Sequence, residues 1–214
     1  MHTRSFFQHM LRLIIIPTFL CSVHSESEHV NTDDPCAFLN NQLIQEFFEV
    51  DAGDINRESS ESSNPSCTVG WVKPNIEELQ KSHQQAMSQY MQDKMAGKDV
   101  KMPAYPGNNH VRLTIHSTVF NDKASAEHSF NTAMQRLQKG TTMEVNGKTE
   151  TVFQYDTVPV ENVADAAHWI EGLSQLSVQS GVRIFHLKVK VYDTAEENRE
   201  TAEKIAQKLA LTLN

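Results

Sequence analysis

The sequence predicts an α+β fold, with a mainly antiparallel sheet covered by helices in a single α/β sandwich domain over residues 35–214. Two patterns lead to this prediction. Segments of alternating polarity are joined by tight turns, which is typical of antiparallel strands. The helical segments each have one apolar stripe, so we expect them to lie on the sheet as a covering layer.

The first part of this domain contains Cys36 and Cys67. Apolar residues at helical spacing after Cys36 predict a short amphipathic helix. The segment 54–66 is rich in Ser, Asn and Glu and predicts a loop that contributes little to a core. Residues 67–72 then predict a strand. The apolar positions of the helix are Leu39, Leu43, Ile44, Phe47 and Phe48.

A long helix is predicted over residues 75–96, because Asn75 can cap its start and Gly97 can end it. A loop containing prolines and glycine follows at 98–109. Residues 110–120 alternate in polarity, so they predict a half-buried strand. Val111, Leu113, Ile115 and Val119 are its expected inward positions, and Arg112, Thr114, His116 and Thr118 are its outward ones.

A third helix is predicted after Asn121 or Asp122, either of which can serve as its N-cap, and Gly140 follows its end. Its expected buried stripe consists of Ala126, Phe130, Met134 and Leu137.

Two hairpins and a helix complete the predicted domain. Asn146-Gly147 favours a type I′ turn between residues 143–145 and 148–155. Ser180-Gly181 connects a strand that contains Leu176 and Val178 to a second strand at 183–192. Thr194 and Glu197 form a capping box, which predicts the start of the last helix. The expected inward residues of this hairpin and helix are Phe185, Leu187, Val189, Val191, Ala202, Ile205, Ala206, Leu209 and Leu213.

Residues 1–25 predict a signal peptide. Arg4 and Arg12 supply the positive charge, no acidic residue occurs before Glu26, and the apolar run at 13–20 is too short to span a bilayer. A buried N-terminal helix is the alternative. We place the cleavage before Glu26, followed by a disordered leader at 26–34.

The predicted location is therefore the periplasm, the cell envelope or the extracellular medium. Cys21 offers a second interpretation, in which the protein is a lipoprotein anchored through this residue, although Leu20 and Thr18 differ from the residues usual there. No segment after the signal is apolar enough to predict a transmembrane helix.

The charge of the chain argues against nucleic acid as a partner. It contains 19 Lys and Arg residues against 27 Asp and Glu residues, a net charge of −8 at pH 7. Such a surface repels polyanions at long range. Glycine-rich phosphate or dinucleotide motifs are also absent from the sequence, so we expect no cofactor.

Cys36 and Cys67 are the only cysteines after the predicted signal. An even number of cysteines in an exported protein favours a disulfide bond. Two free, buried thiols are the alternative. No CxxC motif is present, so the sequence does not predict a thiol oxidoreductase.

Four segments together resemble a family of small secreted bacterial lipoproteins of unknown function. They are Pro35-Cys36-Ala37-Phe38-Leu39, residues 67–71 with Trp71, residues 163–169 with Asp-Ala-Ala-His-Trp, and residues 185–213. The resemblance implies a Cys36–Cys67 disulfide and a compact α/β sandwich. It implies no activity and no catalytic residue.

The main candidate site is formed by two histidines on predicted outward strand positions, His116 and His186. They would meet if their strands were neighbours in the right register, and they could then bind a metal. Two separate, solvated imidazoles are the alternative. No HExxH or similar spacing occurs, so we predict no metal site. Arg112, Lys188 and Lys190 share these faces and could receive an anion, or could be an ordinary solvated surface.

Asp165 and His168 are a second candidate pair, because their spacing could bring them together across a helical turn. The sequence shows no nucleophile motif that such a pair would serve, so we predict no catalytic residue. We expect instead that Asp165 caps a short turn and that Trp169 fills the core.

The predicted function is that of a non-enzymatic module that binds an unknown protein or small ligand through Arg112, His116, His186 and Lys188. The first alternative is a metal-dependent or hydrolytic enzyme that uses His116 and His186, or Asp165 and His168. The second is an accessory factor that contacts partners through the methionine-rich helix at 75–96, where Met87, Met91 and Met95 lie.

Overall fold

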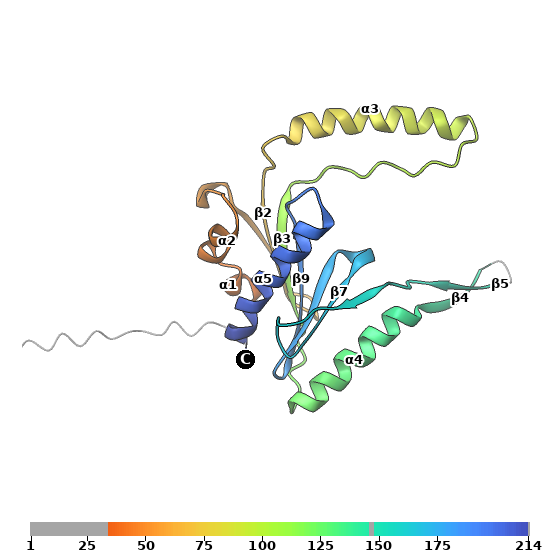
Figure 1. Cartoon of the computed structure of the whole chain (residues 1–214). Helices are drawn as coiled ribbons and strands as arrows, with labels where there is room; N and C mark the ends of the chain where they lie inside the picture. The colour runs from red at the N-terminus through yellow and green to blue at the C-terminus, as the bar shows by residue number, and fades with distance from the viewer. Residues whose placement is uncertain (1–33, 146–147, 214) are drawn as a thin grey trace, which may run out of the picture.

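Seven antiparallel strands form one sheet in the order β1-β2-β3-β9-β8-β7-β6 (Figure 1). The computed structural model describes residues 34–145 and 148–213. The predicted signal at 1–25, Cys21, most of the predicted leader and the Asn146-Gly147 turn lie outside the described residues. The strands of this sheet are β1 (Asn56–Ser60), β2 (Ser66–Trp71), β3 (Asn109–Ile115), β6 (Thr157–Pro159), β7 (Ala166–Ile170), β8 (Gln175–Ser180) and β9 (Arg183–Lys190).

The two faces of the sheet differ because side chains alternate along each strand. On the central strands, Val111 of β3 is paired with Val189 of β9, and Leu113 is paired with Leu187. All four side chains are buried on one face, here called the inner face. The opposite, outer face receives the polar residues of β3 and β9.

Three helices cover the inner face: α1 (Pro35–Phe38), α2 (Asn41–Phe47) and α5 (Ala195–Leu213). α5 begins at the predicted capping box, where the Glu197 amide donates to Thr194 Oγ1 over 3.2 Å. Its buried side then packs on the central strands and closes the main core. The apolar residues of this side are Ala202, Ile205, Ala206, Leu209, Ala210 and Leu213.

Cys36 in α1 and Cys67 in β2 form a disulfide bond, with their Cα atoms 5.0 Å apart. This bond joins the first described helix to a strand of the sheet. The Cys36–Cys67 pairing that the sequence favoured is thereby confirmed.

A fourth helix, α4 (Lys123–Lys139), lies on the outer face, over β7, β8 and β9. Asp122 caps it by accepting a hydrogen bond from the Ser125 amide over 2.7 Å. Phe130 and Met134 of α4 are buried against Ile170 and Ile184 of the sheet. The α+β architecture, with helices over a mainly antiparallel sheet, is confirmed.

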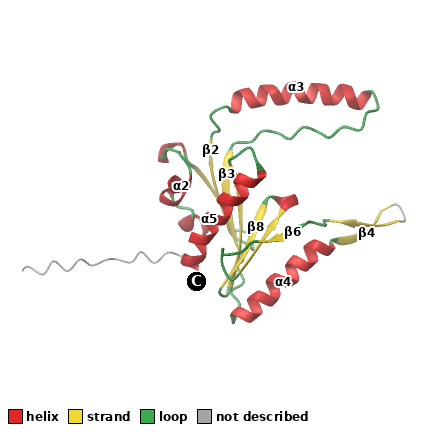
Figure 2. Cartoon of the chain, viewed as in Figure 1, coloured by secondary structure: helices red, strands yellow, loops and turns green. Residues whose placement is uncertain are grey.

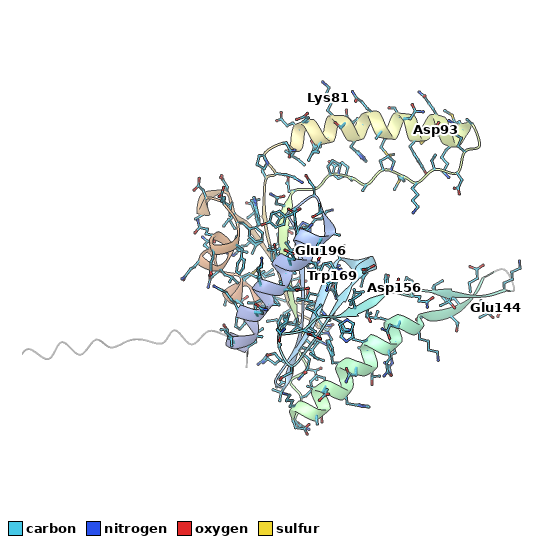
Figure 3. The ribbon with its side chains drawn as sticks, in the orientation of Figure 1. Lys81, Asp93, Glu144, Asp156, Trp169 and Glu196 are labelled. Carbon is cyan, nitrogen blue, oxygen red and sulfur yellow. A yellow bond between two sulfur atoms is a disulfide. The ribbon has the colours of Figure 1, made fainter. Side chains whose placement is uncertain are left out.

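Two segments project beyond the sheet (Figures 1 and 2). The first is α3 (Ile76–Met95), which contains no buried residue and has the segment 97–108 running beside it. The second is the hairpin of β4 (Thr141–Val145) and β5 (Lys148–Val152), which continues outward from α4. Figure 3 shows charged residues on both projections, Lys81 and Asp93 on α3 and Glu144 on the hairpin.

Several boundaries differ from the sequence-based prediction. The predicted helix after Cys36 is two short helices, α1 and α2. A short 3₁₀ helix, η1 (Ala52–Asp54), ends at the first residue of the predicted loop at 54–66, and this loop contains strand β1, whose five residues are all exposed. β3 ends at Ile115, so Val119, expected inside, is 50% exposed.

Asn75 precedes α3, but its side chain does not form the predicted capping hydrogen bond. Of the methionines named for this helix, Met91 and Met95 are exposed, at 54% and 79%, whereas Met87 is partly buried. A partner contact through this helix stays a prediction. In the described part of the chain, no helix combines the length and apolar character needed to cross a membrane.

Candidate functional site

The two candidate histidines come together because β3 and β9 are neighbours. Thr114 of β3 is paired with His186 of β9, and the His116 amide donates to the Ile184 carbonyl over 3.0 Å, just beyond the end of β3. His116 and His186 therefore occupy diagonal positions on the outer face. Their Nε2 atoms are 2.9 Å apart, and their ring planes make an angle of 70°.

Ser177 extends this contact into a three-residue network. It is paired in register with His186 across β8 and β9, and its Oγ lies 2.8 Å from His186 Nδ1. Gln175 Nε2 donates to the same Oγ over a longer distance of 3.4 Å. Polar side chains from three adjacent strands are thus connected on the outer face.

The network admits two sets of hydrogen positions, because Ser177 Oγ can donate to His186 Nδ1 or accept from it. In one set, Ser177 Oγ accepts from Gln175 and donates its own hydrogen to His186 Nδ1. His186 then carries its proton on Nε2 and donates it to Nε2 of His116. Both rings are neutral in this arrangement, which assigns the Nδ1–H tautomer to His116.

The surroundings of the pair favour neutral imidazoles. Burial, together with the positive charges that His116 and Lys188 can carry, lowers the pKa of His186 to about 4. Burial also lowers the pKa of His116. At neutral pH the pair is therefore an uncharged hydrogen-bonding unit.

A cavity of about 660 Å³ lies between α4 and this part of the outer face. Its sheet side carries His116, His186, Ser177 and Gln175. Its remaining walls are mainly apolar, with polar residues of α4 at the edge. The apolar lining consists of Phe130, Ala133, Met134, Leu137, Phe153, Ile170, Leu173 and Ile184, and the polar edge includes His128, Thr132 and Arg136.

Contacts at both ends of α4 connect this helix to the rest of the fold. At its start, Lys123 forms an ion pair with Asp165, which also accepts the Gly181 amide over 2.7 Å. At its end, the Tyr155 amide donates to the Leu137 carbonyl over 3.0 Å. Gly140 follows the helix at a φ of 72°, where a Cβ would lie 2.7 Å from Thr151.

Next to the histidines, Arg112 and Lys188 are directly paired across β3 and β9, and His110 is paired with Lys190. We call these four residues the basic strip. Within the described residues, neither Arg112 nor Lys188 forms an ion pair with a carboxylate; Arg112 donates to Ser66 Oγ over 3.0 Å. Burial and the Arg112 charge lower the pKa of Lys188. Burial is also the main cause that lowers the pKa of His110.

The basic strip borders a second hollow of about 490 Å³, which includes Lys188, Lys190 and His110 in its lining. Leu173, at the end of η2 (Glu171–Leu173), lines both this hollow and the α4 cavity. The two hollows are therefore adjacent at Leu173. His116 and His186 line the α4 cavity, Lys188 lines the second hollow, and Arg112 lines neither but is paired with Lys188 across β3 and β9.

Asp165 and His168 do not form the pair considered from the sequence. The segment that follows Asp165 is strand β7 and not a helix, so two residues three apart point to opposite faces. Asp165 binds Lys123 and Gly181 instead, and the His168 ring packs at 5.8 Å on the Phe130 ring. Trp169 is only 4% exposed and fills the core, as predicted.

The contributions of Ser177, Gln175 and helix α4 to the site were not predicted from the sequence. Ser177 lies between Leu176 and Val178, so alternation along β8 places it on the polar side of a strand. The sequence shows this alternation, but it does not show that Ser177 contacts His186.

No group of three or more His, Cys, Asp or Glu side chains within residues 34–145 and 148–213 is arranged to hold a metal ion. In this described part of the chain, the two histidines are thus a pair without a third ligand of these types in place for a metal ion. Comparisons with protein-family models, with curated proteins and with solved structures gave no significant match.

Proposed function

We propose that this protein is an exported module that binds a small ligand in the cavity between α4 and the outer face of the sheet. The main support is the combination of a largely apolar cavity of about 660 Å³ with a polar floor, which is formed by the hydrogen-bonded side chains of His116, His186 and Ser177. Ligand sites are typically concave and mostly apolar, with a few polar groups that orient the ligand, and have volumes of roughly 300–1,000 Å³.

The floor suits recognition of a polar group at one end of the ligand. His116 and His186 are neutral and hydrogen-bonded to each other, so they present a fixed arrangement with little cost of ordering on binding. The apolar walls offer Ala133, Leu137 and Phe153 to a hydrocarbon part.

Export is part of the proposal. It is supported by the charge and apolar pattern of residues 1–25 and by the disulfide, since such bonds persist mainly in oxidising compartments.

A hydrolytic function has one observation in its favour, the 2.8 Å contact between Ser177 Oγ and His186 Nδ1. A serine nucleophile also needs access to the substrate. Ser177 is fully buried in the sheet. We therefore place ligand binding ahead of hydrolysis.

The experiment is a titration with N-phenyl-1-naphthylamine, a neutral dye that becomes fluorescent in apolar sites. Ala133 is a small residue of α4 that lines the cavity, so Ala133→Phe should fill it and weaken dye binding at least tenfold. Ala124→Phe introduces the same side chain at an exposed position of α4 outside the cavity and serves as the matched control. Absence of dye binding, or equal binding by both variants, would contradict the proposal.

A further inference from the structure

We infer that the ligand is an amphipathic anion, whose hydrocarbon chain occupies the α4 cavity and whose carboxylate or phosphate group binds Arg112 and Lys188. This inference rests on the proposed function and specifies its ligand class.

The first argument is the charge of the basic strip. Like charges placed directly opposite each other on neighbouring strands destabilise a sheet. Arg112 and Lys188 are such a pair, yet the described part of the chain provides neither with a carboxylate partner, in a protein whose net charge is −8. Glu58, the acid in the same row of the sheet, lies on β1, beyond Thr68 of β2.

An anionic group placed between the two cations would remove their repulsion. It would also form charge-assisted hydrogen bonds, which are stronger than those between neutral groups. Arg112 is well suited to this role, because its planar guanidinium can bind a carboxylate or phosphate in a bidentate manner. Lys188 is partly buried, so the bound anion would be partly shielded from water and salt.

The second argument is that one molecule can reach both places. His186 and Lys188 are alternate residues of β9, so their side chains leave the same face about 7 Å apart. Leu173 lines both the cavity beside His186 and the hollow beside Lys188. A chain in the cavity therefore emerges next to the basic strip.

The same geometry disfavours other ligand classes. A cationic amphiphile would place a third positive charge against Arg112 and Lys188. A neutral one would leave this pair uncompensated. A small inorganic anion would gain the charge contacts but would leave the apolar wall at Leu137 and Phe153 without a partner.

The test measures displacement of N-phenyl-1-naphthylamine by single-chain amphiphiles below their critical micelle concentrations. Dodecanoate and dodecyl phosphate represent the two anionic head groups and show which one is preferred. Dodecanol and dodecyltrimethylammonium have the same chain with a neutral or positive head. We expect at least one anion to compete tenfold or more better than dodecanol, and the cation to compete worst.

The variants Lys188→Gln and Arg112→Gln should reduce this anion preference at least tenfold while leaving dodecanol competition unchanged. Lys148→Gln removes an exposed cation from β5, outside the strip, and should leave both values at the wild-type level. If the dye binds in the cavity but anion and alcohol compete equally, the inference fails and the binding function stands. Binding to anionic phosphatidylglycerol vesicles without dye release would also overturn it.

Discussion

Arg112 and Lys188 face each other across β3 and β9 with both cationic side chains on the outer face of the sheet. Their mutual repulsion is present whenever no anion lies between them. The free protein should therefore be less stable than a variant that lacks one of these charges. This difference in stability distinguishes a binding surface from an ordinary solvated surface.

Lys188→Gln should raise the free energy of unfolding by roughly 0.2–1 kcal/mol, because cross-strand like charges cost about this much. The measurement is urea denaturation at low ionic strength, with Lys148→Gln as the control for loss of an exposed cation. The gain should shrink as salt is added, since screening weakens the repulsion in the wild type. A loss of stability in Lys188→Gln would show that the lysine is a structural residue instead.

The stability of the protein should fall between about pH 6.5 and pH 4. Burial holds the pKa of His186 at about 4, below its ordinary value of 6.5. Above pH 6.5 the imidazole is neutral in both the folded and unfolded states, so the full stability is present. As the pH falls toward 4, the unfolded chain binds a proton that the folded protein does not, and the free energy of unfolding decreases.

This loss should be on the order of 3 kcal/mol for His186 at its largest. Denaturation midpoints at pH 7 and pH 4.5 give the comparison. His186→Gln should reduce the pH dependence of the free energy of unfolding. The matched control is His128→Gln, which removes an exposed imidazole at the cavity edge. A wild-type slope that survives in His186→Gln would contradict the assignment.

Removal of the disulfide should destabilise the protein by about 3–4 kcal/mol, because the bond closes a long loop in the unfolded chain. Its two cysteines are 31 positions apart. The Cys36→Ala/Cys67→Ala variant and the wild type with reductant should show similar denaturation midpoints. Cys67 is fully buried, so reduction of the native protein should be slow and should accelerate in urea. An unchanged midpoint would indicate that the reduced loop remains ordered.

Removal of the α3 projection should leave the sheet intact. β2 and β3 are already paired up to Trp71 and Asn109, and α3 contributes no buried side chain. We expect that a short Gly/Ser turn in place of residues 75–106 gives a folded protein with near-wild-type thermal stability and unchanged dye binding. This design retains Lys73, which forms an ion pair with Asp193 at 2.6 Å. Loss of folding would show that α3 supports the sheet.

The sequence predicted the strands and helices with one-sided apolar patterns, and it failed where that pattern is missing. β1 has five exposed residues and no apolar alternation, since its place in the sheet depends on backbone pairing with β2. β7 buries Ala167 and Trp169 on one face and Ile170 on the other, so it also lacks a clean period of two. The helical interpretation of Asp165 and His168 arose from this ambiguity.

The histidine pair shows which part of the site the alternation of polar and apolar residues predicts and which part it does not. Alternation placed His116 and His186 on polar faces, but their contact depends on β3 and β9 being neighbours although the residues are 70 positions apart. No local pattern encodes that adjacency. The cavity could not be predicted from the sequence, because it depends on how α4 packs over the sheet face that contains Ile170 and Ile184.

The Cys36–Cys67 bond also determines how the protein would carry mechanical load. A pulling force that enters the described chain at Asp34 reaches the crosslink two residues later and passes directly into β2. The segment between the cysteines, with the end of α1, all of α2 and β1, therefore bears no tension while the bond is intact. Stretching the oxidised protein should yield a contour about 100 Å shorter than stretching the reduced one, at up to ~3.6 Å per residue.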